Sequence, residues 1–404
     1  MTKTMRLVLI ADTFPPLRSS GAVQLRDLSC EIIKQGYDIV VMIPSSELTQ
    51  PWEAETVHGV SVLRLLAPKT KDISYFKRTI NEMLMPFFMI RNLRKSPYKN
   101  YKFDGVVWYS PSIFLSPLVH YLKGKNCCKS YLILRDIFPD WAVDMGLMRK
   151  GIIYWVLKCI AAYQYKVADI IGVQSKGNLS YFSHLTSKHK KCLQILQNWI
   201  ADTPVGACSI NISNTSLSGR FIFVYAGNMG VAQNVEIFLD LAQRLNERND
   251  IGFVFVGRGS SYQILLEKSK TLDLKNTLFF NEIKPDEITG LYSQCNIGLV
   301  SLDSRHKSHN IPGKFISYMQ SGMPVLASIN EGNDLATLID KNKVGKVSIN
   351  DRNAVSNLES LAIDLIRMVQ SDPHIKTRCK NLYEELFSPA ITVKQITESF
   401  KDDQ

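Results

Sequence analysis

The sequence predicts an α/β protein built from two doubly wound parallel sheets. Short apolar runs rich in Val, Ile and Leu recur along all 404 residues and alternate with stretches of helical periodicity. These runs are continuously apolar, which is typical of parallel strands that are buried on both faces. The repeated strand–helix order favours right-handed, doubly wound sheets. Because one hydrophobic core stops growing at roughly 250–300 residues, a chain of this length is expected to form two domains.

Six runs in the first half are expected to form strands, at residues 6–11, 37–43, 60–66, 104–109, 130–134 and 168–174. The first run is cut off by Asp12, so it is interpreted as a buried strand and not as a signal peptide. Residues 20–35, which follow it, show the helical spacing of apolar residues, with Val23 and Leu28 on one side.

The second half repeats the scheme, with strands expected at residues 221–226, 252–256, 277–280, 296–302, 324–328 and 344–349. The clearest helical pattern covers residues 351–370, which Asp351 opens. The two halves are expected to join near residues 198–206. Ligands bind such sheets outside the carboxyl ends of the strands. The two sheets are therefore expected to face a central cleft that holds two substrates.

The composition is that of an ordinary globular protein. Hydrophobic residues make up 45% and charged residues 21%, which excludes a disordered, collagen-like or polytopic membrane protein. The longest apolar stretch, residues 152–163, is interrupted by Lys158 and falls short of the ~18 residues that a membrane-spanning helix needs. No two of the eight cysteines have C-x-x-C spacing. Neither a zinc site nor a disulfide framework is expected, and a reducing, cytoplasmic compartment is favoured.

The excess positive charge lies entirely in the first half of the chain. Residues 1–200 hold 27 Lys and Arg against 14 Asp and Glu, whereas residues 201–404 hold 21 against 23. Residues 69–102 combine nine basic and two acidic residues with bulky apolar ones, among them Phe87 and Phe88. This combination favours contact with an anionic membrane surface, and the alternative is a core helix with a solvated basic end. No nucleic-acid partner is expected, because zinc-finger spacing, an aromatic-glycine signature and a basic tail are all missing from the sequence.

Four segments resemble landmarks of the retaining family-4 glycosyltransferases, in the order of that family and over nearly the whole chain. They are FPPLRSSGAVQLRDL (14–28), LQNWIAD (196–202), VYAGNMG (224–230) and HNIPGKFISYMQSGMPVLA (309–327). The resemblance implies the GT-B fold, with an acceptor domain at 1–200, a nucleotide-sugar donor domain at 201–388, and a C-terminal helix at 389–404 that packs back on the first domain. Residues 135–146 and 227–236 look most like bacterial O-antigen enzymes that transfer N-acetyl-L-fucosamine.

The donor diphosphate is expected to meet glycines in two loops. Gly21 lies where the first strand turns into its helix, and Gly227 and Gly230 lie in the equivalent loop of the second domain. Glycine lets the backbone approach a phosphate, and a helix N-terminus adds positive potential. A tight strand-to-helix turn without a ligand is the alternative for Gly21. Where many family members carry an Arg and a Lys that bind the diphosphate, this chain has Asn228 and Gln233.

The cationic contact with the donor is therefore expected from another segment. Lys314 in the signature helix is the first candidate, and Arg258 in the GRGS segment is the second. The two glutamates of the family would fall at His309 and Ser317, so both carboxylates are missing. His309 is expected to contact the transferred sugar as a neutral hydrogen-bond donor and Ser317 to bond a ribose hydroxyl. The alternative for His309 is a loop histidine without a role.

The segment RDIFPDW places Arg135, Asp136 and Asp140 just beyond a buried strand of the first domain. Asp136 is the candidate that orients or deprotonates an acceptor hydroxyl. Arg135 and Asp140 are candidates for acceptor binding, Arg135 through the diphosphate of a lipid. An Arg–Asp pair that only stabilises the strand end is the alternative. The resemblance implies front-face attack assisted by the leaving diphosphate, so neither a dedicated nucleophile nor a metal or cofactor is expected beside the UDP-sugar co-substrate.

The leading hypothesis is a retaining hexosyltransferase that moves a sugar from a UDP-sugar to an undecaprenyl-diphosphate-linked glycan of O-antigen or another surface polysaccharide. The closer resemblance implies N-acetyl-L-fucosamine as the sugar, and the inner face of the bacterial plasma membrane as the location. A UDP-sugar 2-epimerase of the same fold is the second hypothesis, which residues 69–102 disfavour because an epimerase needs no lipid acceptor. The third is a catalytically degenerate transferase that acts as a scaffold, motivated by His309 and Ser317.

Overall fold

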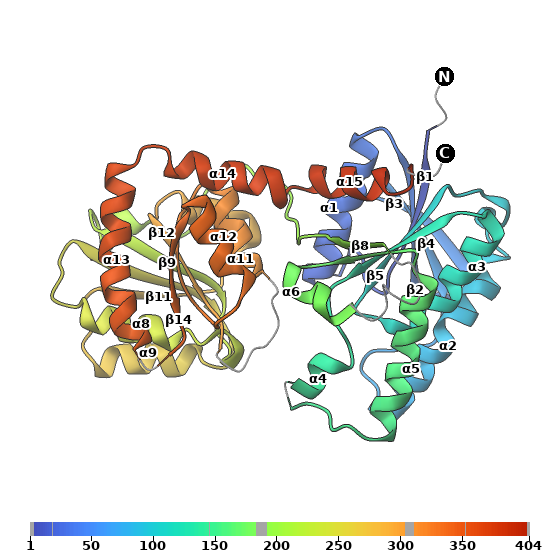
Figure 1. Ribbon diagram of the computed structural model, residues 1–404, viewed down its shortest axis with the longest axis horizontal. Helices are drawn as coiled ribbons and strands as arrows, with labels where there is room; N and C mark the ends of the chain where they lie inside the picture. Colours follow the sequence, from blue (N-terminus) through green and yellow to red (C-terminus); the bar gives the residue numbers. More distant parts are fainter. Residues whose placement is uncertain are drawn as a thin grey trace. The chain divides into compact units, whose positions relative to one another are not determined.

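The computed structural model describes residues 4–17, 19–144, 146–182, 192–303, 311–351 and 353–401, and the chain divides into two compact units (Figure 1). The first unit comprises Met1–Trp199 together with Pro389–Gln404, and the second comprises Ile200–Ser388. Each unit is a sheet covered by helices on both faces. The fold class that the apolar runs predict is therefore confirmed.

The first unit contains an eight-stranded sheet in the order β3-β4-β2-β1-β5-β6-β7-β8. Its strands are β1 (Arg6–Ile10), β2 (Asp38–Ser45), β3 (Trp52–Val57), β4 (Val60–Leu66), β5 (Gly105–Ser110), β6 (Lys129–Leu134), β7 (Ile170–Val173) and β8 (Cys192–Ile195). Neighbouring strands are parallel except β3, which runs antiparallel to β4. The register aligns Leu7 of β1 with Ile39 on β2 and with Gly105 on β5, which makes β1 a central strand.

Helices cover both faces of this sheet. Helix α1 (Ser20–Lys34) and helix α15 (Pro389–Glu398) pack together on one face, where Leu28 and Val393 join the core. Helices α2 (Tyr75–Leu93), α3 (Ser116–Asn126) and α5 (Ile152–Val167) lie side by side on the other face (Figure 1), where Met89 and Leu118 are buried. Shorter elements complete the unit: α4 (Asp140–Asp144), α6 (Lys176–Leu179), η1 (Pro97–Asn100), η2 (Ile113–Leu115) and η3 (Ser180–Phe182).

The second unit contains a six-stranded parallel sheet in the order β11-β10-β9-β12-β13-β14. Its strands are β9 (Phe221–Asn228), β10 (Ile251–Arg258), β11 (Thr277–Asn281), β12 (Ile297–Ser301), β13 (Val325–Ile329) and β14 (Gly345–Ile349). One face is covered by α8 (Glu236–Arg244), α9 (Tyr262–Thr271) and α13 (Ala354–Ser371). The other is covered by α10 (Ile288–Tyr292), α11 (Gly313–Gln320), α12 (Asp334–Asn342) and α14 (Ile375–Leu386). The short turns are η4 (Ile212–Asn214), η5 (Val231–Gln233) and η6 (Pro285–Glu287).

All twelve strands expected from the sequence are present, but the pattern missed β3 and β8. Both are edge strands with partly exposed side chains, so neither leaves a continuous apolar run. The helix expected at 351–370 begins instead at Ala354. Asp351 accepts a hydrogen bond from the backbone N–H of Asn353 over 2.8 Å and so belongs to the preceding turn.

Two further observations concern the chain as a whole. Within the described ranges, no helix combines the length and the apolar character that a membrane crossing requires. The eight cysteines are free thiols.

Candidate functional site

The candidate site lies at the carboxyl edge of the second sheet, where the strand order changes direction. The chain leaves β9 for β10 on one side and leaves β12 for β13 on the other side. Ligands of doubly wound sheets bind at such a switch point. Gly227 lies at the end of β9 and Gly230 in the loop that follows, and α11 follows β12, the direct neighbour of β9. Two of the sequence segments assigned to the donor thus come from adjacent strands at one edge of the sheet.

Lys314, the second residue of α11, brings its ammonium group to the glycine loop. Its Nζ lies 4.7 Å from the centroid of the Tyr225 ring, a cation–π distance. A Cβ atom at Gly227 would lie 2.9 Å from Cε and 3.2 Å from Nζ of Lys314, and the φ angle of Gly227 is 131°. Only glycine therefore allows this side chain to cross the loop so closely.

The ammonium of Lys314 is largely removed from water. Burial lowers the pKa of Lys314 from 10.5 to about 8, and no charged neighbour contributes to the shift. Across the part of the chain that the structure describes, no carboxylate forms an ion pair with Lys314. A buried cation without a counter-ion is costly, so an anionic ligand at the glycine loop would supply the missing negative charge.

The other polar groups of the loop bond to one another. Asn228 Nδ2 donates to Gln233 Oε1 over 3.0 Å, and the backbone N–H of Gly230 donates to the same oxygen over 3.1 Å. The Tyr225 hydroxyl donates to the Asn228 carbonyl over 2.7 Å. Asn228 and Gln233 therefore shape the loop, and the positive charge beside it belongs to Lys314.

Two glycines at the end of the neighbouring strand β10, one in the strand and one just after it, bring a second stretch of backbone against the loop. A Cβ atom at Gly257 would lie 2.0 Å from the Gly227 carbonyl oxygen, and one at Gly259 would lie 2.5 Å from the Met229 carbonyl oxygen. Both glycines have positive φ angles, 151° and 137°. Sequence reasoning missed both positions, although the G-x-G spacing in GRGS was a visible signal. Glycine is required here because two backbones touch.

The remaining donor-site candidates differ in their environment. The Arg258 side chain is 76% exposed and its Nε lies 3.1 Å from a Glu282 carboxylate oxygen, so its charge already has a partner in solvent. Ser317 Oγ donates to the Gly313 carbonyl, one turn earlier in α11, over 3.2 Å. His309 lies outside the described residues. The geometry favours Lys314 over Arg258 as the anion contact, and the roles of Ser317 and His309 stay predictions.

In the first unit, the corresponding switch point lies between β1 and β5. Gly21 is in the first turn of α1, where Ser19 caps the helix by accepting from the Ala22 N–H over 3.3 Å. A Cβ atom at Gly21 would lie 3.1 Å from the hydroxyl oxygen of Tyr109, which comes from β5. Gly21 therefore makes room for an aromatic side chain, and its contact with a phosphate stays a prediction.

Asp12, two residues after the end of β1, is a candidate that sequence reasoning missed. Burial raises the pKa of this carboxyl, and the positive charge of Lys71 is the largest opposing influence. The signal in the sequence was a single carboxylate at the carboxyl end of the central strand. A carboxyl with a raised pKa at a switch point is suited to exchange protons with a bound hydroxyl.

Arg135 is buried beneath Trp199, with its guanidinium carbon 4.5 Å from the centre of the indole ring. Nη1 donates to the Leu196 carbonyl over 3.3 Å, and Nε and Nη2 have no hydrogen-bond partner among the described residues. Burial lowers the pKa of Arg135 to about 10. In this position the guanidinium connects the end of β6 to Leu196 and Trp199, and its contact with an acceptor phosphate stays a prediction.

Asp140 is tied into the protein by three hydrogen bonds. It accepts from the Tyr154 hydroxyl over 2.9 Å, from the Tyr181 hydroxyl over 2.6 Å and from the Lys158 ammonium over 2.6 Å. Burial alone would raise the pKa of Asp140, but these three bonds outweigh it and lower the pKa. The carboxylate thereby joins α4, α5 and η3. Asp136 is half-buried just after β6, so it stays the candidate for contact with an acceptor hydroxyl.

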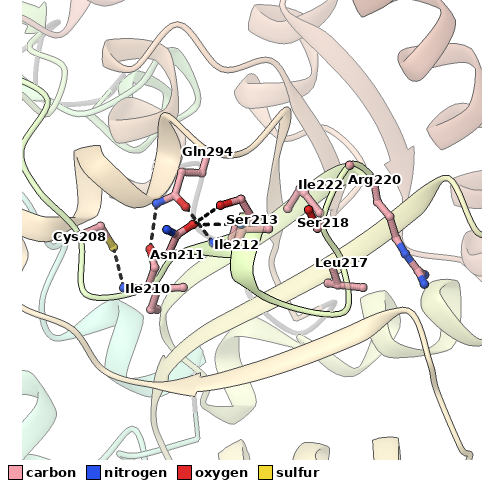
Figure 2. Close-up of a pocket in the computed structure, with 11 residues that line it drawn as sticks. Cys208, Ile210, Asn211, Ile212, Ser213, Leu217, Ser218, Arg220, Ile222 and Gln294 are labelled. Carbon is pink, nitrogen blue, oxygen red and sulfur yellow. Dashed lines mark hydrogen bonds between the residues drawn. The ribbon is translucent and has the colours of Figure 1, made fainter.

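A cavity of about 490 Å³ lies elsewhere in the second unit (Figure 2). It is lined mainly by residues 208–220 and by Gln294, whose amide donates to the Ile210 carbonyl over 2.9 Å. Ile222, near the start of β9, also borders it, whereas Gly227 lies near the end of that strand. The cavity is therefore at the opposite edge of the sheet from the glycine loop.

Comparisons with known proteins give a family match over part of the second unit. Residues 220–369, which include the glycine loop and α11, match the family described as Glycosyl transferases group 1. The chain is 24% identical over 245 residues to the probable glycosyltransferase WbjE of Pseudomonas aeruginosa. This match covers 58% of the chain and 60% of WbjE. The chain is 22% identical over 241 residues to the putative colanic acid biosynthesis glycosyl transferase WcaI of Escherichia coli strain K12, covering 55% and 57%. Each match thus spans less than two thirds of the relative.

Similarity to solved structures extends over almost the entire chain. Anabaena Alr3699/HepE in complex with UDP and glucose superimposes with a TM-score of 0.66 at 12% identity, and the superposition covers 98% of this chain and 100% of that one. At this identity, the likeness establishes the fold. The chain thus has the GT-B fold that the sequence predicts, and its residues 220–369 match the group 1 glycosyl transferases.

Proposed function

We propose that the protein is a retaining glycosyltransferase that uses a UDP-sugar. The second unit binds the donor at the carboxyl edge of its sheet, with the diphosphate between Gly227–Gly230 and Lys314. The relatives support the class of reaction, because both curated names describe glycosyl transferases and the HepE structure holds UDP and glucose. No metal or further cofactor is assigned to the reaction.

The observation that carries the proposal is the ammonium of Lys314, which lies against Gly227 without a counter-ion among the described residues. A diphosphate has the charge that this cation lacks. Gly227 leaves the backbone open to phosphate oxygens, and the Tyr225 ring contacts the ammonium. A neutral ligand at the same place would leave the cost of the buried charge unrelieved.

The same contact supports the transfer step. When the bond between the sugar and the diphosphate breaks, negative charge grows on the leaving group. A fixed cation beside it stabilises the transition state more than the bound substrate. An oxygen of the leaving diphosphate takes the proton of the acceptor hydroxyl on the front face, which retains the anomeric configuration. Asp136 is assigned to orient the acceptor, and His309 and Ser317 are assigned to the sugar and the ribose.

We assign the acceptor to undecaprenyl-diphosphate-linked glycans of O-antigen or another surface polysaccharide, and the sugar to N-acetyl-L-fucosamine. The colanic acid relative supports the polysaccharide class, and the resemblance of residues 135–146 and 227–236 supports the sugar. The excess of basic residues in the first half favours an anionic, lipid-borne acceptor on the inner face of the plasma membrane.

Helix α2 supports a membrane contact through residues 69–102. Its inner side joins the core through Met85 and Met89, so the core-helix alternative describes one face correctly. Its outer side exposes large apolar side chains, among them Phe76 and Phe87. Such an outer face beside basic residues is typical of a helix that lies in the headgroup region of an anionic bilayer.

Binding of UDP to single variants tests the donor site. Lys314→Ala is expected to lower UDP affinity by at least about tenfold, because a hydrogen bond to a charged group contributes about 1.5–3 kcal/mol. Arg258→Ala is the matched control and should retain the affinity of the wild type. Titration calorimetry near neutral pH measures both. An unchanged affinity of Lys314→Ala together with a loss in Arg258→Ala would place the diphosphate at the other cation.

Product mass then tests the reaction and the sugar. The protein is incubated with lipid-linked N-acetylglucosamine and a set of UDP-N-acetylhexosamines. Addition of a deoxy-N-acetylhexosamine is expected, and addition of another sugar would refute only the N-acetyl-L-fucosamine assignment. Isomerisation of a UDP-sugar without any acceptor would identify an epimerase. Tight UDP binding without turnover on any donor would identify a scaffold.

A further inference from the structure

The first turns of α5 expose large apolar side chains that the donor site does not use. Ile152 is 85% exposed, Ile153 70% and Trp155 60%. Leu147, in the segment before the helix, is exposed as well, whereas Tyr154 on the inner side of α5 is buried. The apolar surface is therefore one-sided: the inner face of the helix joins the core and the outer face meets water. We call Leu147, Ile152, Ile153, Trp155 and Val156 the α5 stripe.

The charges around the α5 stripe are mainly basic. Arg149 and Lys150 are exposed and directly precede the helix. Residues 145–168 contain no Asp or Glu. Asp144, three residues before Leu147, is exposed as well. Exposed apolar side chains bordered mainly by basic ones complement the surface of a bilayer, which has an apolar interior beneath anionic headgroups. Tryptophan is also enriched where a protein meets the interface between lipid and water.

The α5 stripe lies at the same edge of the sheet as the exposed side of α2. Helix α2 follows β4 and helix α5 follows β6, and each leads to the next parallel strand, so both run back along the sheet from its carboxyl edge. Both pack against η2, the turn that follows β5. Since the exposed apolar residues of α5 lie in its first turns and those of α2 begin at Tyr75 and Phe76, both sets start from this edge.

We propose that the α5 stripe is a second membrane-contact element, which docks on an anionic bilayer together with α2. The inference rests on the membrane location given under the proposed function, and it assigns that contact to two helices on one face of the first unit. Two contact elements restrict the orientation of the first unit on the membrane more than one helix does. The carboxyl edge of the first sheet, with Asp12 and Asp136, is then kept next to the lipid headgroups.

Binding to vesicles tests the proposal without donor or acceptor. The full chain is co-sedimented with phosphatidylcholine vesicles and with vesicles that also contain phosphatidylglycerol. Ile153→Ser and Trp155→Ser should each lower binding to the anionic vesicles by about tenfold, because burial of one large apolar side chain contributes about 1.5–3 kcal/mol. The matched control is Ile264→Ser on α9 of the second unit, where a side chain of similar exposure is removed, and its binding should equal that of the wild type.

A second readout keeps the test independent of folding defects. Trp155→Phe preserves an apolar side chain, so it should still bind, but the blue shift of tryptophan fluorescence on vesicle addition should shrink. Vesicle binding by the serine variants equal to that of the wild type would overturn the proposal. A wild-type dimer in sedimentation velocity that Trp155→Ser dissociates, with vesicle binding unchanged, would assign the stripe to a second copy and also overturn it. UDP affinity of the wild type reports on the donor site separately, so failure of either idea is recognisable.

Discussion

Replacement of Lys314 by Met should change how UDP binding depends on pH. In the free protein, burial holds the pKa of Lys314 at about 8, so near pH 8 about half of the molecules carry the charge. A bound diphosphate favours the charged form and raises this pKa. Binding at pH 8 should therefore take up about half a proton. Above pH 8, UDP affinity should fall by up to about tenfold per pH unit, because the proton must be added first.

The size of the effect follows from the cost of burying the charge. A pKa of about 8 in place of 10.5 corresponds to roughly 3 kcal/mol against the charged form, at 1.36 kcal/mol per pH unit. Without UDP, the free energy of unfolding depends on pH with the opposite sign to the UDP affinity. Between pH 8 and 10.5 the unfolded chain keeps the proton and the folded protein has released it, so stability rises with pH across this window. Lys314→Met lacks a titrating group and should lose this rise.

Titration calorimetry at pH 8 in two buffers with different ionisation enthalpies measures the proton uptake directly. Arg258→Met, with its charge removed from an exposed ion pair, is the control and should show the proton uptake of the wild type. Absence of proton uptake by the wild type, or the same pH profile in Lys314→Met, would show that Lys314 does not contact the diphosphate.

The remaining predictions concern the loop, the Asp140 network and α2. Gly257→Ala would place a methyl group against the Gly227 carbonyl. It should therefore lower the free energy of unfolding, measured by urea denaturation, by at least about 2 kcal/mol and weaken UDP binding. A variant as stable as the wild type would contradict the loop geometry. Asp140→Asn should lower the free energy of unfolding by about 1–3 kcal/mol at pH 7. This difference from the wild type should disappear below about pH 4, because the wild-type carboxylate becomes protonated as the pH falls through its lowered pKa. Phe87→Ser should weaken the salt-sensitive binding to anionic vesicles and leave the melting temperature unchanged, because Phe87 is exposed. Phe88 is half-buried, so Phe88→Ser should lower the melting temperature. Equal effects of the two substitutions would show that the exposed face is assigned wrongly.

The sequence predicted the fold well because its strands are of one physical kind. A parallel strand that is buried on both faces, such as β9 or β12, leaves a continuous apolar run. The polar β3 and the short β8 bury little and left no such run. Their existence depends on a neighbouring strand that offers hydrogen bonds, which is information that a local pattern does not contain.

The candidate site was predictable in its location but not in its electrostatics. The glycine loop and Lys314 stand out in the sequence, which ranks Lys314 before Arg258 but does not show whether either charge is buried. Their difference arises from tertiary contacts, since Tyr225 and Gly227 enclose one cation while the other lies in solvent with Glu282. Whether a charged group is desolvated depends on residues that are distant along the chain, so sequence spacing does not show it.

The network around Asp140 has a mechanical consequence for the first unit. Lys158 and Tyr154, which bind this carboxylate, belong to the helix whose outer side carries Trp155. The same helix is thus fastened on its inner side to the segment that begins at Arg135, just after β6. Helix α5 would thus contact the membrane through its outer side, while its inner side is hydrogen-bonded to the segment that contains Asp140. If the α5 stripe docks on a bilayer as proposed, the thickness of one helix sets the distance between that loop and the lipid surface, and acceptor groups at that distance would reach the loop.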